Sequence, residues 1–111
     1  MVEEKPIGSI LLADCGAAMT KVVLLEQVAG QYRLVARGEA PTTAEYPWYD
    51  VAEGIRHTVD QISQVVGRGF LDVSRDLIYP ERPGREGVDV FAATASASPP
   101  LKVVLGGLVY D

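Results

Sequence analysis

The chain has 111 residues, which suits one domain with a single hydrophobic core. Its formal net charge is −5 and its ten Lys and Arg residues are scattered, which argues against a nucleic-acid partner. No apolar run approaches the roughly 20 residues of a membrane span, and the acidic-leaning start lacks the basic region of a secretory signal. Because the one cysteine, Cys15, cannot form an internal disulfide, we expect a cytoplasmic protein without a membrane partner.

Three strands are expected first. Residues 9–13 are continuously apolar, which is typical of a central strand covered on both faces. A second strand is predicted from about Thr20 to Val28, and Gly30 indicates a hairpin turn into a third strand over residues 31–38. In the third strand apolar and polar side chains alternate, which predicts one covered face, near an edge of the sheet, formed by Tyr32, Leu34 and Ala36.

A helix is expected next. Asp50 is a candidate N-cap and Glu53 completes a capping-box spacing. Apolar residues then recur at helical spacing, and Gly67 marks the end of this stripe of Val51, Ile55, Val59, Ile62 and Val66. The neighbouring Trp48–Tyr49 pair is expected to fasten the start of the helix to the sheet, whereas exposed rings would indicate a partner surface. Residues 88–94 and 101–110 are predicted to be two further strands.

This element order, β-β-β-α-β-β, predicts an α/β (α+β) fold with a mixed sheet of about five strands and the helix packed on one face. It differs from a dinucleotide-binding unit, in which the glycine turn opens a helix rather than a second strand. It is the opening order of a ribonuclease-H-like fold. We expect the first three strands to be consecutive antiparallel neighbours.

The first strand ends in Asp14-Cys15-Gly16, an acid and a glycine turn at the tip of a buried strand. Backbone amides of such a turn can face an anion, and a carboxylate can hold the water shell of a metal ion. This combination suits a nucleotide phosphate with its magnesium. The alternative is that Asp14 only caps amides of the turn. Cys15 is expected to be a small buried hydrophobe and His57 a surface residue, because nothing near them in the sequence suggests a nucleophile or a zinc site.

Four motifs resemble the MutL family associated with glutamate mutase, which is distinct from the mismatch-repair protein of the same name. They are Asp14-Cys15-Gly16 with Thr20-Lys21, the stretch over residues 32–43, the segment over residues 86–90, and the closing residues 101–109. The resemblance covers residues 10–109, and its most specific piece is Arg37-Gly38-Glu39-Ala40-Pro41-Thr42-Thr43. The first motif also resembles the phosphate loop of the actin, sugar-kinase and heat-shock-chaperone ATPase superfamily.

The resemblance implies an ATPase-like protein that maintains or reactivates an adenosylcobalamin-dependent mutase, as a reactivating factor or chaperone. It also implies that residues 1–111 are a single ribonuclease-H-like N-terminal subdomain of a longer protein, without catalytic residues of its own. ATP and Mg²⁺ are the implied cofactors, with Asp14 on the metal. The implied binding residues are Asp14, Gly16, Ala17, Ala18, Met19, Thr20 and Lys21.

Two departures from the family pattern keep a second function open. Ala17, Ala18 and Met19 stand where the family usually has hydroxyl side chains, and residues 98–100 are Ser-Pro-Pro where a glycine-rich stretch is usual. The alternative is a structural or protein-interaction module that kept the fold and lost the nucleotide. We further expect the chain alone to be catalytically silent and to form a homodimer, through the apolar segment 101–109 or the sheet face beside it.

Overall fold

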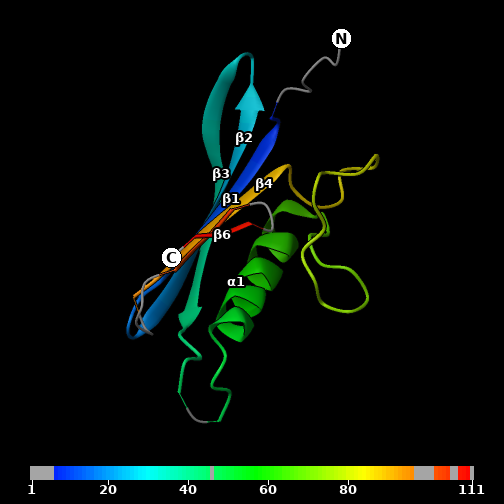
Figure 1. Ribbon diagram of the computed structural model, residues 1–111. Coiled ribbons are helices and arrows are strands. Elements are labelled where there is room, and N and C mark those ends of the chain that lie inside the picture. The colour runs from blue at the N-terminus through cyan, green and yellow to red at the C-terminus, as the bar shows by residue number, and fades with distance from the viewer. Residues whose placement is uncertain (1–6, 46, 97–101, 106–107, 111) are drawn as a thin grey trace.

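The computed structural model describes residues 7–45, 47–96, 102–105 and 108–110. In these residues six strands form one sheet and one helix packs on it (Figure 1). In chain order the elements are β1 (Ser9–Cys15), β2 (Met19–Val28), β3 (Gln31–Pro41), α1 (Val51–Val66), β4 (Val90–Ala95), β5 (Lys102–Leu105) and β6 (Leu108–Tyr110). The strand order is β3-β2-β1-β4-β5-β6, with β1 parallel to β4 and every other neighbouring pair antiparallel. The predicted mixed α/β architecture is therefore confirmed.

The first three strands form a meander, as predicted. The turn between β2 and β3 consists of Ala29 and Gly30, which have positive φ angles of 52° and 80°. The segment 101–110 differs from its prediction as one strand, because β5 and β6 are two short antiparallel strands. The two glycines at positions 106 and 107 are a hairpin signal in the sequence; they and Leu101 lie outside the described residues.

Helix α1 begins and ends where the sequence predicts. The side chain of Asp50 accepts a hydrogen bond from the amide of Ala52, and Gly67 closes the helix in the left-handed conformation. The expected capping box does not form: Asp50 donates its amide to the carbonyl of Thr43, and the carboxylate of Glu53 pairs with Arg56 instead, at 2.9 Å. No helix in the described ranges is long and apolar enough to cross a membrane.

The hydrophobic core lies between α1 and one face of the sheet. Side chains of β1 alternate between buried and more exposed positions, so Leu11 and Ala13 face the helix while Leu12 is 40% exposed. The largest apolar side chains of the core, all nearly inaccessible, are Phe70, Leu11, Leu24, Ile62, Val22, Val59 and Val88. The helix and the loop over residues 67–89 lie on the same side of the sheet (Figure 1). The prediction that residues 9–13 are covered on both faces is therefore wrong for the described part of the chain.

A β-bulge in β3 redirects its side chains. The register between β2 and β3 shifts at Leu24 and Leu25, so that Leu24 lies opposite Ala36 and Leu25 lies opposite Leu34. Val35 is the extra residue of the bulge. Ala36 is consequently buried under α1, whereas Leu34 is 56% exposed on the opposite face. The prediction that Tyr32, Leu34 and Ala36 share one covered face is wrong, although β3 is indeed an edge strand.

The outer edge of β3 is contacted by the helix. Gln61 of α1 donates its side-chain amide to the carbonyl of Glu39 at 3.0 Å, and its carbonyl oxygen accepts from the amide of Glu39 at 3.3 Å. Gly38 permits this close approach, since a Cβ there would stand 2.9 Å from Gln61 Oε1 and 3.1 Å from Thr58 Cγ2. The side-chain amide of Gln61 thus occupies backbone groups that a further strand would otherwise pair.

The loop over residues 67–89 is tied to the sheet by the side chain of Arg68, which is only 8% exposed. Its guanidinium forms ion pairs with Glu26 of β2 and with Glu81, the latter at 2.8 Å, and donates to the carbonyl of Gly87. Phe70 lies beneath the guanidinium, 5.0 Å from its carbon to the ring centroid. One side chain therefore joins β2 to two parts of the loop.

The aromatic pair before α1 is placed differently from the prediction. Trp48 is 50% exposed and Tyr49 is 72% exposed. The Trp48 ring stands edge-on to His57 of α1, with 6.4 Å between ring centroids. The contact is therefore with an exposed residue of the helix, and Trp48 does not fasten the helix to the sheet.

Candidate functional site

Asp14 lies at the carboxyl end of β1, beside the carboxyl end of the parallel strand β4. The register places it opposite Thr94, whose hydroxyl donates to Asp14 Oδ1 at 3.3 Å. From this point the chain leaves β1 toward β2 on one side, and β4 is flanked by β5 on the other. Open α/β sheets bind ligands at the carboxyl ends of parallel strands where the connections diverge in this way. Asp14 thus occupies the position in the sheet where a ligand is most expected.

The turn after Asp14 is held by three hydrogen bonds, one within the turn and two from Thr42. The amide of Gly16 donates to the carbonyl of Met19 at 2.9 Å, which closes the turn. Thr42, at the end of β3, donates its amide to Ala18 O and its hydroxyl to Gly16 O. Ala17, at the tip, is exposed and takes part in no hydrogen bond within the described part of the chain. A fixed turn with an unused amide at its tip is suited to contact an anion.

Thr42 was not among the predicted site residues. Its role depends on β3 ending beside the β1–β2 turn, which the local pattern does not reveal. The signal available in the sequence is its place in the family-specific stretch over residues 37–43.

The remaining predicted residues divide between the two faces of the sheet. Thr20 is fully buried on the helix side, where its hydroxyl lies 3.0 Å from that of Thr42. Lys21 pairs directly with Asp14 in the register and shares its exposed face. Met19 is 37% exposed, and Ala17 and Ala18 are exposed as well. Asp14 and Lys21 are therefore brought together, whereas Thr20 supports the turn from beneath.

A groove runs along β2 and β3 beside Asp14, on the same face. Its volume is about 520 Å³, within the range of small-molecule sites. Charged side chains from both strands, Lys21, Arg37 and Glu39, line it. Among the described residues neither Lys21 nor Arg37 forms an ion pair. The groove therefore presents two cations that form no ion pair, together with the carboxylate of Glu39, next to the Asp14 turn.

Cys15 and His57 have the structural roles expected from the sequence. Cys15 is 1% exposed, and burial raises the pKa of its thiol, while a hydrogen bond with Thr20 acts in the opposite direction. A thiol that is buried and held in its neutral form is a poor nucleophile. His57 is exposed on α1, 3.6 Å from Glu53.

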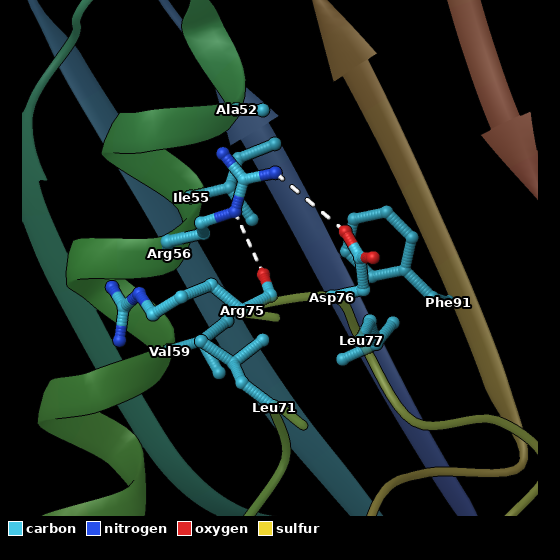
Figure 2. Close-up of a pocket in the computed structure, with 9 residues that line it drawn as sticks. All are labelled: Ala52, Ile55, Arg56, Val59, Leu71, Arg75, Asp76, Leu77 and Phe91. Atoms are coloured by element: carbon cyan, nitrogen blue, oxygen red, sulfur yellow. Dashed lines mark hydrogen bonds and ion pairs between the residues drawn. The ribbon is translucent and has the colours of Figure 1, made fainter. Parts of the chain in front are cut away.

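A second pocket, shown in Figure 2, lies on the helix side of the sheet. It holds about 140 Å³ between α1, β4 and the loop over residues 67–89, which is below the size of ordinary small-molecule sites. Its apolar walls come from Ile55, Val59, Leu71, Leu77 and Phe91. At its rim Arg56 donates to the carbonyl of Arg75 and lies 4.0 Å from Asp76. The pocket is therefore too small for a nucleotide and is on the other face from Asp14.

Asp14 is the candidate metal ligand expected from the sequence. The carboxylate is exposed and accepts a hydrogen bond from Thr94, which leaves the other oxygen unoccupied within the described residues. No group of three or more His, Cys, Asp or Glu residues in the described ranges could hold a metal ion. Mg²⁺ commonly binds through one or two carboxylates plus waters and substrate phosphates.

The comparisons with known proteins identify the family. A family model described as MutL protein matches residues 10–111. The chain therefore belongs to the MutL protein family, as its sequence motifs predict. No curated protein and no solved structure matched it.

Proposed function

We propose that this chain forms one side of an ATP phosphate-binding site in a MutL-like protein that maintains or reactivates an adenosylcobalamin-dependent mutase. The proposal assigns the chain to the ribonuclease-H-like fold of the actin-like ATPase superfamily. The observation that carries it is the place of Asp14, at the carboxyl end of a central strand beside its one parallel neighbour in the described sheet.

The surroundings of Asp14 support an anionic ligand with a cation. The amide of Ala17 is available at the tip of the turn, and Lys21 and Arg37 contribute positive charge in the adjoining groove. The carboxylate of Asp14 is free to hold water molecules of the magnesium shell. The amino end of α1 is not an alternative phosphate site, because Asp50 and Thr43 already accept from the amides of Ala52 and Gly54.

A magnesium–ATP titration followed by backbone NMR tests the proposal. Because one side of a cleft supplies only part of the contacts, we expect a dissociation constant on the order of millimolar. Shifts should concentrate at residues 14–21 and weaken when EDTA removes the metal. Asp14→Asn should reduce affinity about tenfold, which corresponds to about 1.4 kcal/mol.

Glu86→Gln is the matched control, since Glu86 is an exposed carboxylate whose side chain forms no hydrogen bond or ion pair in the described structure. It should bind as the wild type does. Binding that is unchanged by Asp14→Asn, or shifts spread away from residues 14–21, would show that the site is wrongly placed.

A second candidate function is a protein-interaction module without nucleotide. Leu12 and Leu34 favour it, because both are at least 40% exposed on the face of the sheet that carries no helix. Direct binding of the chain to a purified adenosylcobalamin-dependent mutase, with no response to ATP, would support this alternative over the first.

A further inference from the structure

The face of the sheet opposite α1 is apolar over much of its area. We call it the open face and define it by the side chains of β1, β2, β3 and β4 that point away from the helix. Its apolar side chains include Ile10, Leu12, Val23, Leu25, Leu34 and Val90. Figure 1 shows that neither α1 nor the loop over residues 67–89 covers this side. Exposed apolar patches of this kind mark interaction surfaces.

Three of the four charged residues of the open face lie in one row near the carboxyl end of β1, and the fourth, Arg37, lies in the next row opposite Val23. From β3 to β4 the row consists of Glu39, Lys21, Asp14 and Thr94, each directly opposite the next in the register. The signs alternate, yet Lys21 forms no ion pair with either neighbour at 4.0 Å or less. The charged side chains of this row can therefore form ion pairs with a second surface on which the same charges run in the opposite order.

We propose that a second copy of this chain packs on the open face, related by a two-fold axis that runs along the strands between β1 and β2. This axis places β1 of one copy over β2 of the other. Asp14 then faces Lys21 of the second copy, and the symmetry repeats the contact. Leu12 faces Val23 and Ile10 faces Leu25 in the same way, while Arg37, at the end of the row of Val23, faces Ala92.

The charge row selects this arrangement. Two sheets that pack face to face keep their strand directions within about 30° and lie about 10 Å apart. An axis across the strands would instead bring the charge row against the opposite end of the face, where Gln27 and Tyr32 offer no opposite charge. Only the axis along the strands pairs Asp14 with Lys21 twice. A self-complementary patch of this kind is what a two-fold interface requires.

The interface does not depend on nucleotide binding and would in fact compete with it. It covers Asp14 and the groove at Lys21, so the dimer and the phosphate site exclude one another. An experiment without nucleotide therefore tests the dimer separately from the proposed function.

The test reverses the charge of Asp14 or of Lys21 and measures dimerisation by sedimentation equilibrium. In Asp14→Lys the new lysine faces Lys21 of its partner, and in Lys21→Glu the new glutamate faces Asp14. Each variant alone should dimerise at least tenfold more weakly than the wild type. Mixed in equal amounts they should form a heterodimer, since both facing pairs are then of opposite charge. Arg82→Glu, an exposed charge reversal with no side-chain partner in the described structure, should dimerise normally.

An apolar pair of variants keeps the test independent of the charged residues. Leu34→Asp should also weaken the dimer, whereas Val73→Asp, at a fully exposed position of the loop, should leave it unchanged. Circular dichroism checks that each variant is folded. A wild-type chain that stays monomeric at millimolar concentration overturns the proposal. So does a mixture of the two charge variants that remains monomeric although both are folded.

Discussion

Replacing Arg68 by methionine should destabilise the fold far more than removing an arginine from the surface. Arg68 is 8% exposed and pairs with Glu26 and Glu81, whose side chains are 15% and 26% exposed. Methionine keeps much of the length of the side chain and its contact with Phe70. The substitution therefore removes the charge and its hydrogen bonds while largely retaining the packing.

The magnitude follows from what the substitution leaves behind. Removing one partner of a buried ion pair costs about 3–5 kcal/mol, because the other charge stays buried and uncompensated. Here Arg85 still contacts Glu26 at 2.7 Å, and Glu81 can reach some water. The lower end, about 3 kcal/mol, is therefore expected. For a domain near 100 residues this lowers the melting temperature by about 10–20 °C.

The assay is urea unfolding followed by circular dichroism, with Arg75→Met as the matched control. Arg75 pairs with Asp60 at 3.0 Å, but both side chains are nearly half exposed, so its loss should cost at most about 1 kcal/mol. If Arg68→Met costs no more than Arg75→Met, the Arg68 network does not hold the loop to the sheet as described.

Of three further predictions, two concern the contacts of α1 with the sheet and one concerns the buried thiol of β1. Gly38→Ala should destabilise by about 1–3 kcal/mol in urea unfolding, because its Cβ would stand 3.1 Å from Thr58 Cγ2 and would push Gln61 Oε1, 2.9 Å away, off the amide of Glu39; no loss would mean that α1 can shift away from β3 without cost. Thr43→Val should cost about 1–3 kcal/mol, since the buried Thr43 hydroxyl accepts from the amide of Gly54 at 2.8 Å; the same melts measure it. Because burial raises the folded-state pKa of Cys15, the stabilisation linked to its thiol is full below the unfolded value of 9.0 and is lost as the pH rises through the folded pKa. Cys15→Ala should flatten that loss between pH 8 and pH 10, and equal slopes would contradict this.

Local signals in the sequence predicted the elements well. The bounds of α1 could be derived from the sequence, because the signals for its ends, the cap at Asp50 and the glycine at position 67, are adjacent to the helix they delimit. The Ala29–Gly30 turn is equally local. The bulge at Val35 could not be derived, because a bulge depends on the register between two strands and leaves the sequence alternation unchanged.

The candidate site was predictable only in part. Asp14 follows an apolar strand, which is visible in the sequence. Its neighbour Thr94 is 80 residues away, and the parallel pairing that joins them depends on the whole fold. Likewise the continuous apolar run over residues 9–13 indicates two apolar faces but does not say what covers each one. The structure places the helix on one of them and leaves Leu12 exposed on the other.

The contact between Gln61 and Glu39 protects one edge of the sheet from pairing with a strand of another copy. The side-chain amide of Gln61 already bonds the backbone N–H and C=O of Glu39. A strand of another chain therefore cannot pair with β3 past Glu39 without breaking the hydrogen bonds between Gln61 and Glu39. Among the described residues, the main contacts of α1 with the sheet are those with β3, β2 and β1. Gln61→Ala should therefore leave the edge of β3 free to pair with a strand of another copy.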